Sequence, residues 1–387
     1  MPQESREALE PPAFQLQSLA EFTDDFVAAV QAAGTDDQVG IENMLWEVTD
    51  ETTPIFDSLQ EAKARGVKDV RLHMGRIGEN QIRTYENGEI AAEALIVLGR
   101  IAATGEAKAA LKEAAALRSD RFSAMDRAGI TDPSHRERGH YPILSHNHVK
   151  TAFVGDVAWI MTNNFRGLDY QISNFALKVT DPEAVKFIKE KFHRTEVPEP
   201  DANDRLVIER DEEGDEKTTL LFDGGARGSS VSMERALELA DSLQPGDEFT
   251  FVSQWPPVGK VLGFPFFGVM DTALREKMAA GVKGTYLVNP AEKLTPASAK
   301  VNARIKKKLD SREEEEPNLD IVHLPIGTHA KAFFVKRANG DTEVICGTHD
   351  FAEWTVKIGT RELSLWSKDP EITSQLEQFI NDIQQPA

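Results

Sequence analysis

A histidine followed two residues later by a lysine occurs twice in this chain, each time at the start of an apolar run. The first pair is His148 and Lys150, and the second is His329 and Lys331, 181 residues further on. Residues i and i+2 of a β-strand point to the same face of a sheet, so each histidine shares a face with its lysine. If the two halves of the chain pack with these faces together, two imidazoles and two ammonium groups line one anion-sized pocket.

Each pair is followed by a second apolar run that ends in a threonine and a short polar residue. The first copy ends in Thr162 and Asn164, and the second ends in Thr348 and Asp350. A single histidine–lysine pair before an apolar run is ordinary strand sequence. Two copies with the same polar ending indicate an internal repeat that carries function.

This set of side chains suits chemistry at a phosphodiester. One imidazole can attack phosphorus as a nucleophile while the other protonates the leaving alkoxide. Histidine changes its charge near neutral pH, so one ring can start neutral and the other protonated. The lysines, with neutral donors such as Asn164 and Thr348, can stabilise the charge on the equatorial oxygens. We therefore expect catalysis without a metal ion or a cofactor.

These residues resemble the signature of the phospholipase D superfamily, a duplicated H-x-K-x4-D followed by G-S-x-N. The matching residues of the first copy are His148, Lys150, Thr162 and Asn164, and those of the second are His329, Lys331, Gly347, Thr348 and Asp350. The resemblance covers about residues 20–385. It implies two similar α-β-α lobes related by a pseudo-twofold axis, an active site at their seam, and a covalent phosphohistidine intermediate.

The chain departs from the family pattern at three positions. Gly155 and Lys336 stand where the signature has its acidic residue, although Asp156 follows one place later in the first copy. Asp350 stands where the second copy usually has asparagine. These departures leave the histidines and lysines intact, but they keep open the alternative of a catalytically weakened anion-binding or scaffold protein.

The resemblance also implies an acidic residue, late in the sequence, that orients the histidine of the other half. Glu362 is the candidate, and its counterpart in the first half is Asn174. A carboxylate on the distal imidazole nitrogen fixes the tautomer and strengthens the ring as a nucleophile. By resemblance the nucleophile is His148 and the acid is His329. The residue pattern itself leaves this assignment open.

Alternating helix and strand patterns predict an α/β fold in each half. Helical patterns over 55–65 and 270–280 each end at a glycine, Gly66 and Gly281, and lead into a short strand. The other predicted helices cover 19–33, 183–192, 232–243 and 371–383, and the other predicted strands cover 40–48, 248–254, 331–335 and 343–346. An insertion at 89–128 is expected to be helical. The polar stretch 195–204 predicts a linker between domains 1–197 and 205–387.

Composition limits the partners of the chain. Its 64 acidic and 44 basic residues give a net charge of −20, which opposes nonspecific binding to nucleic acid. The N-terminus has no pattern of a secretory signal, and no apolar run is long enough for a transmembrane segment. Cys346 is the single cysteine, so it forms no intramolecular disulfide. We expect a cytoplasmic protein that can also lie peripherally at a membrane.

The sequence thus predicts a phospholipase D-like phosphodiesterase or phosphatidyltransferase that acts on phospholipid or another phosphodiester. The first alternative is a nuclease-type phosphodiesterase, which has the same chemistry but needs a basic groove. The second is the weakened anion-binding or scaffold protein. Both alternatives remain open at this point.

Overall fold

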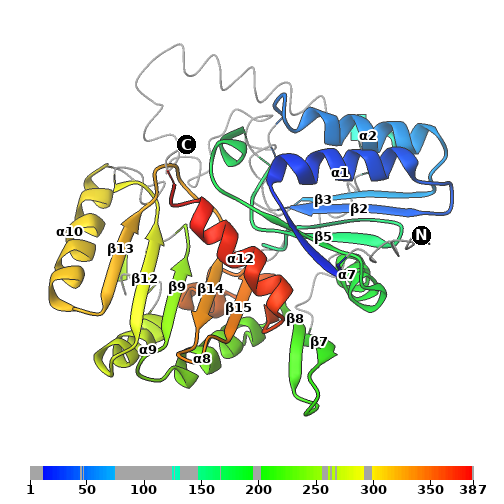
Figure 1. Cartoon of the computed structure of the whole chain (residues 1–387). Helices are drawn as coiled ribbons and strands as arrows, with labels where there is room; N and C mark the ends of the chain where they lie inside the picture. Colours follow the sequence, from blue (N-terminus) through cyan, green and yellow to red (C-terminus); the bar gives the residue numbers. More distant parts are fainter. Residues whose placement is uncertain are drawn as a thin grey trace, which may run out of the picture.

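The computed structural model describes residues 12–43, 46, 48–74, 124–125, 127–130, 147–165, 167–194, 202–254, 260–261, 264–265, 268–291 and 299–385. These residues form two α/β lobes that lie side by side, each built on one large β-sheet (Figure 1). Most of the predicted insertion 89–128 and most of the predicted linker 195–204 lie outside the described residues.

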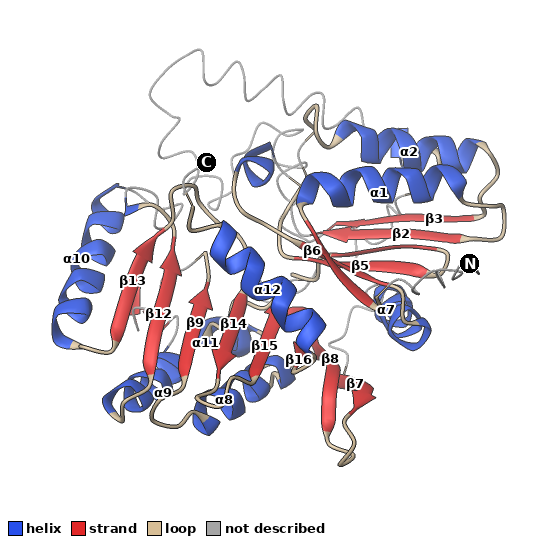
Figure 2. Ribbon diagram, in the orientation of Figure 1, coloured by secondary structure: helices blue, strands red, loops and turns tan. Residues whose placement is uncertain are grey.

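The first lobe has a six-stranded sheet in the order β1-β6-β5-β4-β2-β3. The strands are β1 Phe14–Gln17, β2 Gln38–Asn43, β3 Asp69–Met74, β4 Thr151–Val154, β5 Val157–Met161 and β6 Ala176–Val179. Helices α1 (Leu19–Ala32) and α2 (Thr53–Ala64) cover one face, and α7 (Pro182–Arg194) lies on the other (Figure 2). A short 3-10 helix, η1, covers Gly167–Gln171.

The second lobe has an eight-stranded sheet in the order β13-β12-β9-β14-β15-β16-β8-β7. The strands are β7 Asp204–Arg210, β8 Glu216–Gly224, β9 Glu248–Val252, β12 Lys283–Val288, β13 Leu319–His323, β14 Ala332–Lys336, β15 Thr342–Gly347 and β16 Arg361–Ser367. A separate two-stranded ribbon pairs β10 (Lys260–Val261) with β11 (Phe264–Pro265). The helices are α8 Val231–Ser242, α9 Gly268–Ala279, α10 Ala299–Glu315, α11 Glu353–Ile358 and α12 Pro370–Asp382.

The two sheets repeat one topology, which confirms the internal repeat predicted from the sequence. In the first lobe β2 pairs parallel to β3 and antiparallel to β4, and β5 and β6 continue antiparallel. In the second lobe β9 pairs parallel to β12 and antiparallel to β14, and β15 and β16 continue antiparallel. Each H-x-K segment therefore enters the equivalent strand, β4 or β14, at the middle of its sheet.

A shared apolar core joins the lobes. It contains Phe153 of the first sheet, Phe222 and Phe334 of the second, and the inner faces of α7 and α12. Helix α12 contacts β1 of the first lobe, and α7 contacts β7 of the second. Each fully buried large apolar side chain contributes about 1.5–3 kcal/mol. The lobes are therefore held together by packing that fixes the seam between them.

Local sequence explains the ends of the helices. Asp369 caps α12 by accepting hydrogen bonds from the backbone N–H groups of Glu371 (2.8 Å) and Ile372 (3.3 Å). Pro370 follows at the first helical position, where its missing N–H costs no hydrogen bond. Gly66 and Gly281 have φ angles of +96° and +107°, which confirms them as the left-handed residues that end two helices.

The predicted elements match the observed ones to within a few residues at most ends. The clearest difference is the strand predicted over 40–48, since β2 covers Gln38–Asn43. Beyond it, Trp46 makes an isolated parallel bridge with Phe165 and is fully buried. Trp46 is therefore buried outside the regular strand, and sequence alternation alone cannot distinguish such a residue from one in a strand. In the described part of the chain, no helix has the length and apolar character needed to cross a bilayer.

Candidate active site

Backbone hydrogen bonds join each H-x-K segment to the opposite lobe. The N–H of His148 donates to the carbonyl of Arg361 at 3.0 Å, and the N–H of His329 donates to the carbonyl of Ser173 at 3.3 Å. The residue before each histidine also forms an isolated parallel β-bridge with that same partner. Asn147 pairs with Arg361, and Thr328 pairs with Ser173. Each histidine is thus fixed to the lobe that it does not belong to, by equivalent contacts.

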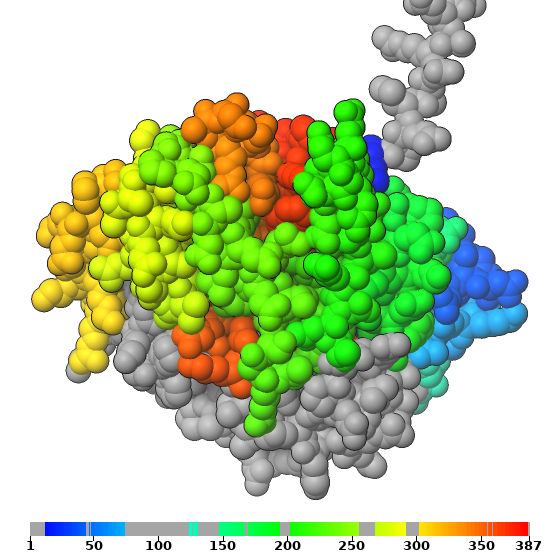
Figure 3. Space-filling view, turned by 90° about the horizontal axis from the view of Figure 1, so that it is seen from below, coloured from blue at the N-terminus to red at the C-terminus, as the bar shows by residue number. Residues whose placement is uncertain are grey.

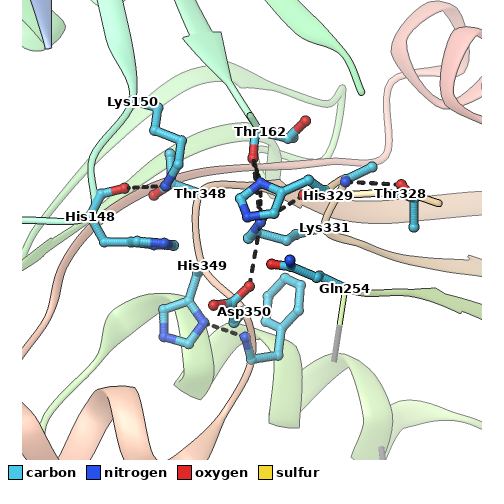
Figure 4. A network of polar contacts seen from close by, with 12 residues as sticks. His148, Lys150, Thr162, Gln254, Thr328, His329, Lys331, Thr348, His349 and Asp350 are labelled. Atoms are coloured by element: carbon cyan, nitrogen blue, oxygen red, sulfur yellow. Dashed lines mark hydrogen bonds and ion pairs between the residues drawn. The ribbon is translucent and has the colours of Figure 1, made fainter. Parts of the chain in front are cut away.

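The four basic side chains meet at this seam (Figure 4). His148 and Lys150 lead into β4, and His329 and Lys331 lead into β14. Both imidazole rings are directed towards one region, with Asp350 at its border. None of the four basic residues is more than 6% exposed. The two pairs therefore lie close together at the seam, as the sequence predicted.

His148 is held by a carboxylate of the other lobe. Its Nδ1 lies 3.0 Å from both Oε1 and Oε2 of Glu362. The hydroxyl of Thr348 donates to Glu362 Oε2 at 2.6 Å and accepts a hydrogen bond from the N–H of Leu363 at 2.9 Å. A proton on Nδ1 directs the lone pair to Nε2, so this contact fixes both the ring orientation and the tautomer.

Burial makes this carboxyl an unusually weak acid. Desolvation raises the pKa of Glu362 to about 8, against the opposing effect of the nearby His349 and Lys150. The Glu362 carboxyl therefore holds a proton more tightly than a solvent-exposed glutamate does.

His329 has a neutral partner instead. Its Nδ1 lies 2.7 Å from the carbonyl oxygen of Thr162, and a carbonyl only accepts, so Nδ1 carries a proton. Lys331 Nζ donates to the same oxygen at 3.3 Å. Asn174, which occupies the place of Glu362 in the first lobe, donates from Nδ2 to the carbonyl of Asp169 at 2.7 Å. The two histidines therefore differ in the charge of the group at their Nδ1 side.

Both lysines fold back on their own segment in the same way. Lys150 Nζ donates to the carbonyl of His148 at 2.9 Å, and Lys331 Nζ donates to the carbonyl of His329 at 2.6 Å. Burial and the charge of Lys331 lower the pKa of Lys150 to about 7. An anion bound between the two ammonium groups would offset this repulsion.

Asp350 adds a negative charge beside Lys331. Its Oδ1 lies 3.4 Å from Lys331 Nζ. Burial acts to raise the pKa of Asp350, but Lys331 and His148 outweigh it and hold the pKa below its usual value. Asn164 is the equivalent residue of the first lobe and is 1% exposed. The site is thus asymmetric, with a neutral amide on one side and a carboxylate on the other.

The turn that carries Asp350 is fixed by a third histidine. His349 Nδ1 accepts a hydrogen bond from the N–H of Phe351 at 2.7 Å, and its Nε2 lies 3.3 Å from the hydroxyl of Ser230. Phe351 has a φ of 52°, the left-handed region that a phenylalanine rarely adopts. His349 therefore acts as a buried support of the turn.

Gly347 allows β15 to approach β16 next to Thr348. A Cβ at this position would lie 2.4 Å from the carbonyl oxygen of Leu363, and its φ is +148°. Only glycine fits both constraints. The Gly-Thr step of the second copy therefore has a local reason: it places the Thr348 hydroxyl against Glu362.

Two solved structures share this architecture. A polyphosphate kinase from Porphyromonas gingivalis matches with a TM-score of 0.52 and 14% identity, over 96% of this chain and 50% of the kinase. A phosphatidylserine synthase from Haemophilus influenzae Rd KW20 matches with a TM-score of 0.61 and 12% identity, over 96% of this chain and 86% of the synthase. The two-lobe fold is phospholipase D-like. At these identities the similarity concerns the fold alone, and it confirms the two-lobe fold class predicted from the sequence.

The sequence itself matches no family model and no curated protein. This chain spans about half the length of the polyphosphate kinase and most of the phosphatidylserine synthase. The phospholipase D-like fold could therefore be predicted from the sequence only by a few widely separated residues.

The phospholipase D-like fold brings the predicted site residues to the seam. Those that take part in the contacts above are His148, Lys150, Thr162, His329, Lys331, Thr348, Asp350 and Glu362, while Asn164 lies two residues after Thr162. The sequence did not indicate the carbonyl of Thr162 as the partner of His329, because a backbone contact carries no residue signal. Among the described residues, no group of three or more His, Cys, Asp or Glu side chains could hold a metal ion.

Proposed function

We propose that this protein is a phosphodiesterase of the phospholipase D type that hydrolyses or transfers a phospholipid head group through a covalent phosphohistidine. The observation that carries the proposal is the contact of Glu362 with His148 Nδ1, made from the opposite lobe inside a buried cluster of two histidines and two lysines. This cluster offers a nucleophile, an acid and cations for one phosphate group.

In the first step, the lone pair of His148 Nε2 attacks phosphorus and forms an N–P bond. The P–O bond to the leaving alcohol breaks, and the doubly protonated ring of His329 gives its Nε2 proton to the departing oxygen. Glu362 stabilises the positive charge that develops on the His148 ring. His329 keeps its Nδ1–H bonded to the carbonyl of Thr162 throughout.

In the second step, water or an alcohol attacks phosphorus and breaks the N–P bond. His329 Nε2 takes the proton of the attacking hydroxyl, which restores the starting state of both rings. Water gives hydrolysis, and an alcohol gives transfer. Lys150, Lys331 and the Asn164 amide are the groups that stabilise the nonbridging oxygens in both steps.

The choice of a phospholipid is supported by charge and by fold. The net charge of −20 repels a long polyanion such as nucleic acid. The fold similarity to a phosphatidylserine synthase extends over 96% of this chain. We also propose the domains 1–197 and 205–387, because the site needs one basic pair from each. The protein is proposed to be cytoplasmic and to contact the membrane peripherally.

The proposal is tested with a substrate panel in the presence of EDTA. The panel contains phosphatidylcholine, phosphatidylglycerol, single-stranded DNA and bis-p-nitrophenyl phosphate. We expect turnover of lipid that is lost in His148→Ala and in His329→Ala and kept in His323→Gln, which changes a histidine on β13 outside the site. Cleavage of DNA alone would favour the nuclease, and silence on every substrate would favour the anion-binding protein.

A further inference from the structure

Asp350 places a negative charge in this site, and the binding of a phosphate group does not explain why a carboxylate is there. Its carboxylate is 5% exposed, and within the described part of the chain its Oδ1 accepts no hydrogen bond. A buried carboxylate oxygen without a hydrogen-bond donor is costly. The nonbridging oxygens of a phosphodiester only accept hydrogen bonds, so the phosphate cannot supply the missing donor and repels this charge instead.

The carboxylate is held in its position. The Asp350–Phe351 turn is supported by His349, whose Nδ1 accepts the Phe351 N–H, and by the hydroxyl of Ser230 on the other ring nitrogen. Lys331 and His148 keep the pKa of Asp350 below its usual value, although burial acts in the opposite direction. Asp350 is therefore ionised at neutral pH and acts as an acceptor, not as a proton donor.

Asp350 lies next to the basic pair of the second lobe. Its Oδ1 is 3.4 Å from Lys331 Nζ, and this Nζ is 3.2 Å from His329 Nδ1. In the proposed function, His329 protonates the leaving alcohol and later deprotonates the incoming one. In that proposal the alcohol reacts next to this basic pair in both steps, so the same carboxylate is available to it each time. The equivalent residue of the first lobe, Asn164, carries no charge.

We propose that Asp350 selects the alcohol of the reaction, favouring leaving and acceptor alcohols that carry a hydrogen-bond donor, an ammonium N–H or a hydroxyl, close to the reacting oxygen. This inference rests on the proposed function. Ethanolamine and glycerol provide such a donor. Ethanol provides none, and the quaternary ammonium of choline has a charge but no N–H. An alcohol without a donor leaves Oδ1 of Asp350 without a hydrogen bond, which disfavours that alcohol.

The first test compares four short-chain phosphatidyl esters, those of ethanolamine, glycerol, choline and ethanol. We expect the 387-residue chain to hydrolyse the ethanolamine and glycerol esters about 10-fold to 100-fold faster than the ethyl ester, the range for a hydrogen bond to a charged group. In Asp350→Asn this ratio falls towards one, and in the control Asp341→Asn, in an exposed hairpin turn, it is unchanged. An equal rate for all four esters, or a ratio that survives in Asp350→Asn, would overturn the inference.

The second test measures binding and needs no turnover. The His148→Asn chain, with and without Asp350→Asn, is titrated with glycerophosphoethanolamine and glycerophosphocholine by calorimetry. We expect tighter binding of the ethanolamine diester, and loss of that preference in the double variant. This test also shows whether the site recognises a soluble diester that has no acyl chains.

The two proposals fail in different ways. Bis-p-nitrophenyl phosphate has no donor next to its leaving oxygens, so it reports the chemistry alone. Turnover of this diester without discrimination among the four esters overturns the role of Asp350 and keeps the proposed function. Binding that prefers the ethanolamine diester, without turnover of any substrate, contradicts the proposed function and keeps the recognition by Asp350. Absence of turnover and of binding overturns both.

Discussion

Glu362 Oε1 lies 3.0 Å from His148 Nδ1, although 214 positions separate the two residues in the sequence. The contact crosses the seam between the lobes, and the Thr348 hydroxyl holds the carboxyl from its other side. No equivalent carboxylate stands in the first lobe, where the position belongs to Asn174. This asymmetry gives the two histidines different electrostatic partners.

Replacement of Glu362 tests this relationship. Glu362→Gln keeps the size of the side chain but cannot stabilise a positive imidazole, so we expect turnover to fall about 10²–10⁴-fold, the range of a general acid–base contribution. The control is Glu377→Gln, which changes a partly exposed carboxylate paired with Lys336. Steady-state rates of both variants check the prediction. Equal activity of Glu362→Gln and the control would contradict it.

Gly347 links the fold to the site. Gly347→Ala forces a Cβ against the carbonyl of Leu363 at a φ of +148°, so we expect a loss of about 2–4 kcal/mol in the free energy of unfolding. Gly340→Ala, at a φ of +94° with no atom near the new Cβ, should cost about 1 kcal/mol. Urea denaturation of the two variants measures the difference. Equal losses would mean that the approach of β15 to β16 is not constrained at Gly347.

Anion binding should weaken as the pH rises through 7. Burial and the neighbouring Lys331 lower the pKa of Lys150 to about 7. The free site therefore loses the positive charge of Lys150 above pH 7, whereas an exposed lysine keeps its charge to a much higher pH. Sulfate does not titrate in this range. We expect its dissociation constant to rise by up to about tenfold per pH unit above 7, with proton uptake on binding.

The matching variant for this pH effect is Lys150→Met, which has no titrating group at this position. Calorimetric titration with sulfate at several pH values compares it with the unchanged chain. We expect weaker binding and a flatter pH profile in Lys150→Met. Identical profiles would show that Lys150 does not titrate near neutral pH.

Much of this fold could be predicted because it repeats. The two H-x-K pairs and the helix-stopping glycines Gly66 and Gly281 stand at equivalent places of two lobes, and a repeated pattern is strong evidence where a single copy is weak. The polar endings of β5 and β15 were found in the same way.

Other parts of the site had no signal in the sequence. The contact of His329 with the Thr162 carbonyl uses backbone atoms, and any residue could provide that oxygen. The strand predicted over 40–48 ends at Asn43, although Trp46 beyond it is buried, because burial produces the same apolar pattern inside and outside a strand. The left-handed φ of Phe351 depends on the His349 ring below the turn, a tertiary contact.

The most direct test of the account is to trap the phosphorylated enzyme. Bis-p-nitrophenyl phosphate has a leaving group that needs no acid, so His329→Asn should form the intermediate and release it slowly. After an alkaline quench, peptide mass spectrometry should place one acid-labile phosphoryl adduct on His148, absent from His148→Asn. An adduct on His329 in the unchanged chain, or turnover without any histidine adduct, would contradict the account.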